Sequence, residues 1–71
     1  METQSVNVVK EIYNHLERDP RTKKAIIEVT SEHGIVTLSG MVKDAKTLMA
    51  AEEIARQQQG VISVVNELKV G

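Results

Sequence analysis

The spacing of apolar residues changes along the chain, and each change predicts a new type of element. Near the N-terminus the apolar positions recur three and four residues apart, as on one side of a helix. They are Val6, Val9, Ile12, Tyr13 and Leu16. Ser5 or Asn7 is expected to cap the start of this helix. Asp19-Pro20 is expected to end it, because proline pushes the preceding residue out of the helical region.

From Ala25 the period becomes two, which is typical of half-buried strands. Ile27 and Val29 fall on one face, opposite Ile26, Glu28 and Thr30. Residues 31–34 predict a turn, with Gly34 where a positive φ is required. The next strand alternates between two sets, Val36, Leu38, Gly40 and Val42 against Ile35, Thr37, Ser39 and Met41. The two strands predict a β-hairpin, and Gly40 is expected to mark a bulge or a close approach of the next helix.

A second helix is predicted from about Ala45, with Asp44 as its N-cap and Gly60 as its stop. Its inward positions are Leu48, Ala51, Ile54, Ala55 and Gln58. Its predicted solvent-facing side carries Lys46, Glu52, Glu53, Arg56 and Gln57. Residues 61–70 are rich in β-formers and predict a third strand. The side chains expected to share its inner face are Ile62, Val64, Leu68 and Val70.

These elements predict an α+β fold in the order α-β-β-α-β, in one domain spanning residues 1–71 with a core from about 6 to 70. Both helices must cover the same face of a three-stranded sheet, which leaves the opposite face open. A right-handed crossover through the second helix would set the third strand parallel to the second and give a mixed sheet.

Composition narrows the possible functions. The chain has no cysteine, which excludes disulfides and thiolate chemistry. A net charge of -1 and a single aromatic residue, Tyr13, argue against nucleic acid as a partner. The apolar runs are far shorter than the roughly 20 residues that span a bilayer, so no transmembrane segment is expected. The start of the chain has no signal-peptide pattern, although a segment excised from a longer protein would also lack one.

Three segments together resemble the BON domain of bacterial envelope proteins: residues 34–42, 51–55 and 60–70. The motif positions are Gly34, Val36, Leu38, Gly40, Val42, Ala51, Ala55, Gly60, Val61, Val64, Asn66, Leu68 and Val70. The most specific feature is a G-x-V-x-L-x-G-x-V strand followed at the right distance by a G-V-x-x-V-x-N-x-L-x-V strand. Gln58 departs from the aliphatic residue usual in that family, so looser packing is expected in the last turn of the second helix.

The resemblance implies a binding module with no enzymatic activity and no cofactor. Its implied ligand is a phospholipid membrane or another component of the cell envelope, as in periplasmic stress-response proteins of bacteria. Some similar domains are cytoplasmic and bind potassium, which gives a small-cation binder as one alternative. The implied compartment is the periplasm or envelope if the chain belongs to a longer protein, and the cytoplasm if it is complete.

A basic cluster is the most specific candidate site. Four cations lie within seven residues around Asp19-Pro20: Arg18, Arg21, Lys23 and Lys24. Each could contribute about 1 kcal/mol near an anionic membrane, and Lys43 and Lys46 are candidate helpers. The alternative is a solubilising connection that offsets the negative end of the helix dipole.

The open sheet face offers a different interface. Ile26, Ile35 and Met41 would form an exposed patch for a protein partner, a tandem domain or a second copy, or would be scattered β-formers without a partner. No catalytic or metal-binding residue is assigned. His15 and His33 belong to no recognisable triad or ligand set, and adjacent Glu52 and Glu53 point about 100° apart on a helix.

Overall fold

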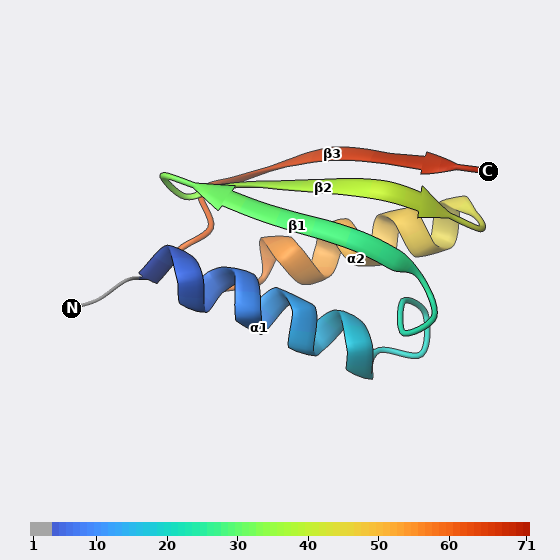
Figure 1. The fold of residues 1–71 in the computed structure, drawn as a ribbon, viewed down its shortest axis with the longest axis horizontal. Helices are drawn as coiled ribbons and strands as arrows, with labels where there is room; N and C mark the ends of the chain where they lie inside the picture. The colour runs from blue at the N-terminus through green and yellow to red at the C-terminus, as the bar shows by residue number, and fades with distance from the viewer. Residues whose placement is uncertain (1–3) are drawn as a thin grey trace.

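The computed structural model describes the backbone of residues 4–71 and the side chains of residues 8–71. Five elements follow one another, as Figure 1 shows. They are α1 (Gln4–Arg18), β1 (Ile26–Glu32), β2 (Ile35–Val42), α2 (Ala45–Arg56) and β3 (Ser63–Val70). The predicted order α-β-β-α-β is therefore confirmed.

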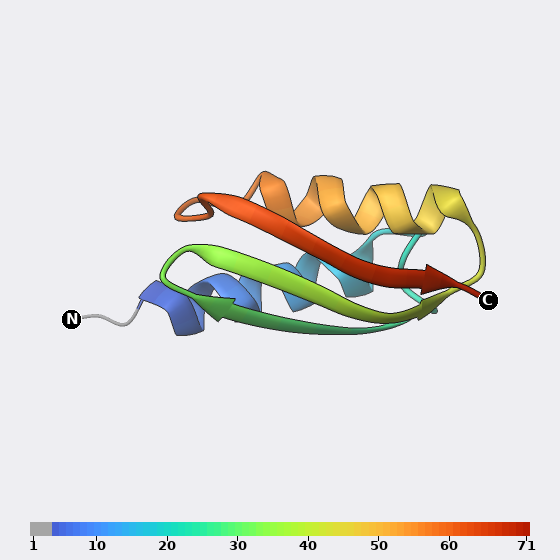
Figure 2. The same cartoon turned by 90° about the horizontal axis from the view of Figure 1, so that it is seen from above.

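The three strands form one mixed sheet in the order β1-β2-β3. β1 runs antiparallel to β2, with Val29 opposite Leu38, and β3 runs parallel to β2, with Leu38 opposite Asn66. Both helices lie on the same face of the sheet, as Figure 2 shows, so the opposite face is left open. The predicted parallel pairing of the last strand and the two-layer arrangement are both confirmed.

The first helix differs from the prediction at its N-terminal end. It begins at Gln4, so Ser5 and Asn7 lie within the helix and neither is its N-cap. The residues that it buries follow a spacing of four: Val8, Ile12 and Leu16. Val9 and Tyr13 pack at the side of the core, and the side chain of the predicted Val6 lies outside the described residues.

The helix ends at Arg18, as the Asp19-Pro20 pair predicts, and the loop that follows is fixed by one buried side chain. Thr22 is only 1% exposed, and its hydroxyl donates a hydrogen bond of 2.7 Å to the Leu16 carbonyl oxygen. That carbonyl has no partner within the helix, because the last turn of a helix leaves its acceptors free. The loop between α1 and β1 is therefore anchored to the core.

The turn between β1 and β2 is tighter than predicted. It consists of His33 and Gly34 alone, and both have positive φ, at 54° and 83°. Two such residues form the turn whose twist matches that of a hairpin. The Gly34 carbonyl oxygen then accepts a 2.7 Å hydrogen bond from the Ile62 amide, which joins the turn to the start of β3.

Gly40 fills neither of its predicted roles. The register between β1 and β2 continues through it without a bulge, with Gly40 opposite Ile27. Its φ is 129°, and a Cβ there would lie 2.6 Å from the Ile26 carbonyl oxygen. The close approach is therefore between two strand backbones and does not involve α2.

The second helix, α2, begins where the sequence predicts but ends earlier than predicted. An Asp44 carboxylate oxygen accepts hydrogen bonds of 2.9 Å from both the amide and the hydroxyl of Thr47. The helix ends at Arg56 with Gln57 as its C-cap, so Gly60, at φ 94°, belongs to a turn beyond the helix. The buried side chains of this helix are Thr47, Ala50, Ala51, Ile54 and Ala55.

The predicted inner face of the third strand is correct only in its middle. Val64 packs on the core and Leu68 is buried, but Ile62 is 79% exposed and Val70 is 53% exposed. Ile62 precedes the strand, where its amide is turned toward Gly34, and Val61 takes its place against the core. Val70 is the last residue of an edge strand and lies beside the end of β2.

Candidate functional site

The antiparallel pairing of β1 and β2 brings two loops to the same end of the molecule. The loop before β1 and the loop after β2 meet there because the first residues of β1 lie beside the last residues of β2. Between them is an open hollow of about 850 Å³. Its cationic lining residues are Arg21, Lys23, Lys24, Lys43 and Lys46.

Four of these cations form what we call the lysine cluster: Lys23, Lys24, Lys43 and Lys46. Among the side chains of residues 8–71, no carboxylate lies within ion-pair distance of any of the four. Asp44 also lines the hollow, and its hydrogen bonds with Thr47 and the nearby charges of Lys43 and Lys46 lower its pKa. The hollow therefore holds one carboxylate among several lysines, and its net charge is positive.

Arg21 lines the hollow, but its charge is already compensated. Its Nη2 lies 2.8 Å from Asp19 Oδ2, its Nε lies 3.0 Å from Asp19 Oδ1, and its Nη1 lies 3.7 Å from Glu53 Oε1. Hydrogen bonds from the Arg21 side chain and backbone amide lower the pKa of Asp19 to about 2. In turn, the carboxylate of Asp19 raises the pKa of Arg21.

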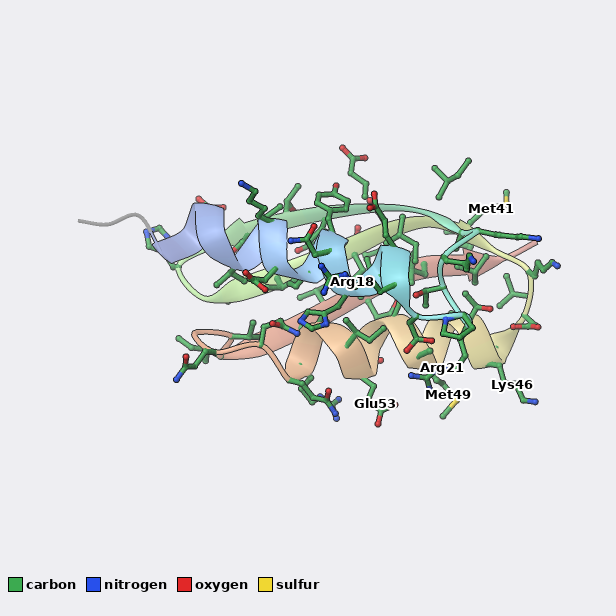
Figure 3. All side chains as sticks on the ribbon, turned by 90° about the horizontal axis from the view of Figure 1, so that it is seen from below. Arg18, Arg21, Met41, Lys46, Met49 and Glu53 are labelled. Carbon is green, nitrogen blue, oxygen red and sulfur yellow. The ribbon has the colours of Figure 1, made fainter. Side chains whose placement is uncertain are left out.

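Arg18 does not reach the hollow. It lines a separate depression with His15, Asp19 and Glu53 at the side of the two helices. Figure 3 shows Met41 and Lys46 near the end of the molecule, with Arg18 farther from that end. The predicted six-residue cluster is thus divided. The four lysines line the hollow, Arg21 is ion-paired beside it, and Arg18 lies in the second depression, which Arg21 also borders.

Two large apolar side chains lie beside the lysine cluster. Ile26 and Met41 face each other across β1 and β2, both line the hollow, and they are 85% and 64% exposed. Lys69 of β3 is the strand neighbour of Met41 on the same open face. No local sequence pattern places Lys69 beside this pair, because its position depends on the register of β3 against β2.

At the helix-covered face, the polar side chain of Asn66 joins β3 to α2. Its Nδ2 donates a 3.1 Å hydrogen bond to Glu52 Oε1 and lies 3.5 Å from the Leu48 carbonyl oxygen. Its Oδ1 accepts a 3.0 Å hydrogen bond from the Leu68 amide. Asn66 therefore has a structural role and does not line the hollow.

Comparison with protein families gives a clear assignment. The model of the BON domain matches residues 4–71. The chain belongs to the BON domain family. A comparison with curated proteins gave no match. BON is a family of binding domains and not a known enzyme family.

The residues that carry the BON resemblance are mainly structural. The buried ones are Val36, Leu38, Val42, Ala51, Ala55 and Leu68. Gly34 and Gly60 occupy turns with positive φ, and the Asn66 side chain hydrogen-bonds β3 to α2. Membership in the BON family therefore fixes the fold, whereas the lysine cluster belongs to positions outside the motif.

The two edges of the sheet are partly closed to an added strand. On β1 the Val29 amide donates a 2.8 Å hydrogen bond to the Tyr13 hydroxyl. On β3 the Leu68 amide is bonded to Asn66, as described above. Each of these amides donates its hydrogen bond within the chain, which reduces the number of free backbone donors that an incoming strand could pair with.

The remaining candidate groups do not come together. His15 lies on α1, where its Nε2 is 3.9 Å from Glu11 Oε1, and His33 lies in the hairpin turn. Within residues 8–71, no three side chains of the metal-binding types form a group that could hold an ion. No helix in the described part of the chain has the length and apolar character needed to cross a membrane.

Proposed function

We propose that this BON domain is a non-catalytic module that binds the anionic surface of phospholipid membranes through the lysine cluster. The observation that carries the proposal is the convergence of Lys23 and Lys24, in the loop before β1, with Lys43, in the loop after β2, and Lys46, in the first turn of α2. The two pairs of lysines lie some twenty residues apart in sequence. A chain of net charge -1 has no general attraction for an anionic surface. Attraction must therefore come from one side of the molecule.

The magnitude suits recruitment to a charged bilayer. A lysine near an anionic membrane surface contributes about 1 kcal/mol. Three lysines would therefore raise the partition coefficient by roughly two orders of magnitude. The effect falls with added salt, because the Debye length shortens from about 10 Å at 0.1 M to about 3 Å at 1 M.

The test is co-sedimentation with phosphatidylglycerol-containing vesicles and with purely zwitterionic vesicles. A variant carrying Lys23→Gln, Lys24→Gln and Lys43→Gln is expected to lose roughly one hundredfold in partition coefficient on anionic vesicles. A matched control neutralises Lys10, Arg18 and Arg56, which lie outside the hollow. It changes the net charge equally and is expected to bind within about threefold of the wild type. Equal losses in both variants would show that only net charge matters and would refute the assignment.

Association with an envelope protein or with a second copy is the second candidate. The observation that favours it is the open sheet face, on which Ile26, Ile35, Met41 and Val65 are all at least 42% exposed. Association with a second copy predicts a mass above that of the monomer in sedimentation equilibrium, with the excess lost on dilution. A monomeric mass at all concentrations, together with binding to anionic vesicles, would favour the lipid surface over self-association.

A further inference from the structure

We infer that the end of the sheet enters the bilayer interface, with Ile26 and Met41 as the inserted side chains and the lysine cluster at the headgroups. This inference rests on the proposed function and adds an orientation and a depth to it. It predicts that the molecule stands on this end of the sheet and does not lie on its open face.

The strand register places the two apolar side chains in one row. Ile26 faces Met41, and Met41 faces Lys69, at the end of the sheet that borders the hollow. Exposure of an isolated apolar residue is ordinary on a protein surface. Here two large side chains lie side by side, and lysines from the two adjacent loops and the first turn of α2 lie next to them. This combination matches a membrane interface, where apolar groups enter the acyl boundary and lysines remain at the phosphates.

The next row of the open face carries the opposite charge. Glu28 and Glu67 face Ser39 from the two outer strands, and both glutamates are exposed. A molecule lying flat on its open face would bring both carboxylates against anionic lipids. The change from lysines at the end to glutamates in the middle therefore favours an end-on orientation.

The backbone that carries the two side chains is held in place. Thr22 anchors the loop before Ile26 by its buried hydrogen bond to the Leu16 carbonyl oxygen. After Met41, Asp44 fixes the start of α2 through its two hydrogen bonds with Thr47. The apolar pair is thus presented in a preorganised position, which limits the ordering entropy lost on binding.

The opposite end of the same face supplies a matched control. Ile35 is 45% exposed and lies opposite Glu32, beside the hairpin turn. It has the same side chain as Ile26 and also lies on the open face. It is at the other end of the paired strands, away from the lysine cluster. An effect of side-chain type alone would appear equally at both positions.

The first experiment measures partitioning into vesicles of phosphatidylglycerol and phosphatidylcholine. In the double variant, Ile26→Thr keeps a β-branched residue and Met41→Gln keeps the approximate side-chain length. This variant is expected to bind about tenfold more weakly. Ile35→Thr is expected to remain within about twofold of the wild type. The loss should persist in high salt, where the contribution of the lysines is screened. Equal binding by all three proteins would overturn the inference.

The second experiment uses the absence of tryptophan from the chain, so that one introduced indole reports on one position. Met41→Trp is expected to shift its emission to the blue on vesicles and to be quenched by brominated acyl chains, whereas Ile35→Trp should show neither effect. Binding without a shift at either position, or with equal shifts at both, would overturn the insertion and leave the proposed function standing. Absence of binding by the wild-type chain would refute the proposed function itself.

Discussion

The hydrogen bonds of Asn66 provide a quantitative test of how the last strand is held. Asn66→Asp keeps an oxygen that can accept from the Leu68 amide but removes the donor that Glu52 Oε1 receives at 3.1 Å. It also places a second carboxylate at that distance. At neutral pH the variant should therefore lose a hydrogen bond and gain a repulsion.

The size of the effect follows from the partly exposed setting. The Glu52 side chain is 31% exposed and also pairs with Arg56 at 2.7 Å, so solvent and the arginine moderate the repulsion. A hydrogen bond to a charged group contributes about 1.5–3 kcal/mol. With screening, we expect Asn66→Asp to lower the free energy of unfolding by about 2 kcal/mol. For a domain of this size that corresponds to a fall in Tm of roughly 8–16 °C.

A double-mutant cycle with Glu52→Gln isolates the interaction. Glu52→Gln alone should be nearly neutral, because the glutamine oxygen still accepts from Asn66. In that background Asn66→Asp should be milder, since the aspartate faces an amide and can accept its hydrogen bond. Melting followed by circular dichroism gives both differences. An Asn66→Asp variant as stable as the wild type, or an equal loss with and without Glu52, would refute the role assigned to this contact.

Two further predictions concern Gly40 and Asp19. Gly40→Ala should destabilise the fold by about 2–4 kcal/mol, because alanine must adopt a φ of 129° and its Cβ would meet the Ile26 carbonyl oxygen at 2.6 Å. An unchanged midpoint of urea unfolding would contradict this prediction. The pKa of Asp19 falls from 3.8 to about 2 on folding, so the stability it contributes is present above pH 3.8 and is lost as the pH falls toward 2. Asp19→Asn should therefore show a smaller decrease of Tm across that interval, and parallel Tm profiles for variant and wild type would count against the Asp19–Arg21 contact.

Several features of the fold follow from short-range chemistry and could be predicted from the sequence. The alternation of Ile27 and Val29 set the inner face of β1, and Asp44 marked the start of α2. The errors arose where tertiary contacts outweigh local signals. Gly60 resembles a helix stop, yet α2 ends at Arg56 and the glycine supplies a later turn. Ile62 fits a strand pattern, yet its amide is held by Gly34 before the strand begins.

The candidate site depends on information that no local pattern contains. Nearness in sequence grouped Arg18 and Arg21 with Lys23 and Lys24, whereas the fold sets Arg18 apart and pairs Arg21 with Asp19 and Glu53. The hairpin register then brings the end of β2 beside the start of β1, which adds Lys43, from the loop after β2, and Lys46, from the start of α2, to the lysines of the first loop. Because that register is fixed by burial of one strand face, a slip of one residue would move core residues outward and turn Ile26 or Met41 toward the helices. The same burial that stabilises the sheet therefore determines the composition of the surface that we propose binds the membrane.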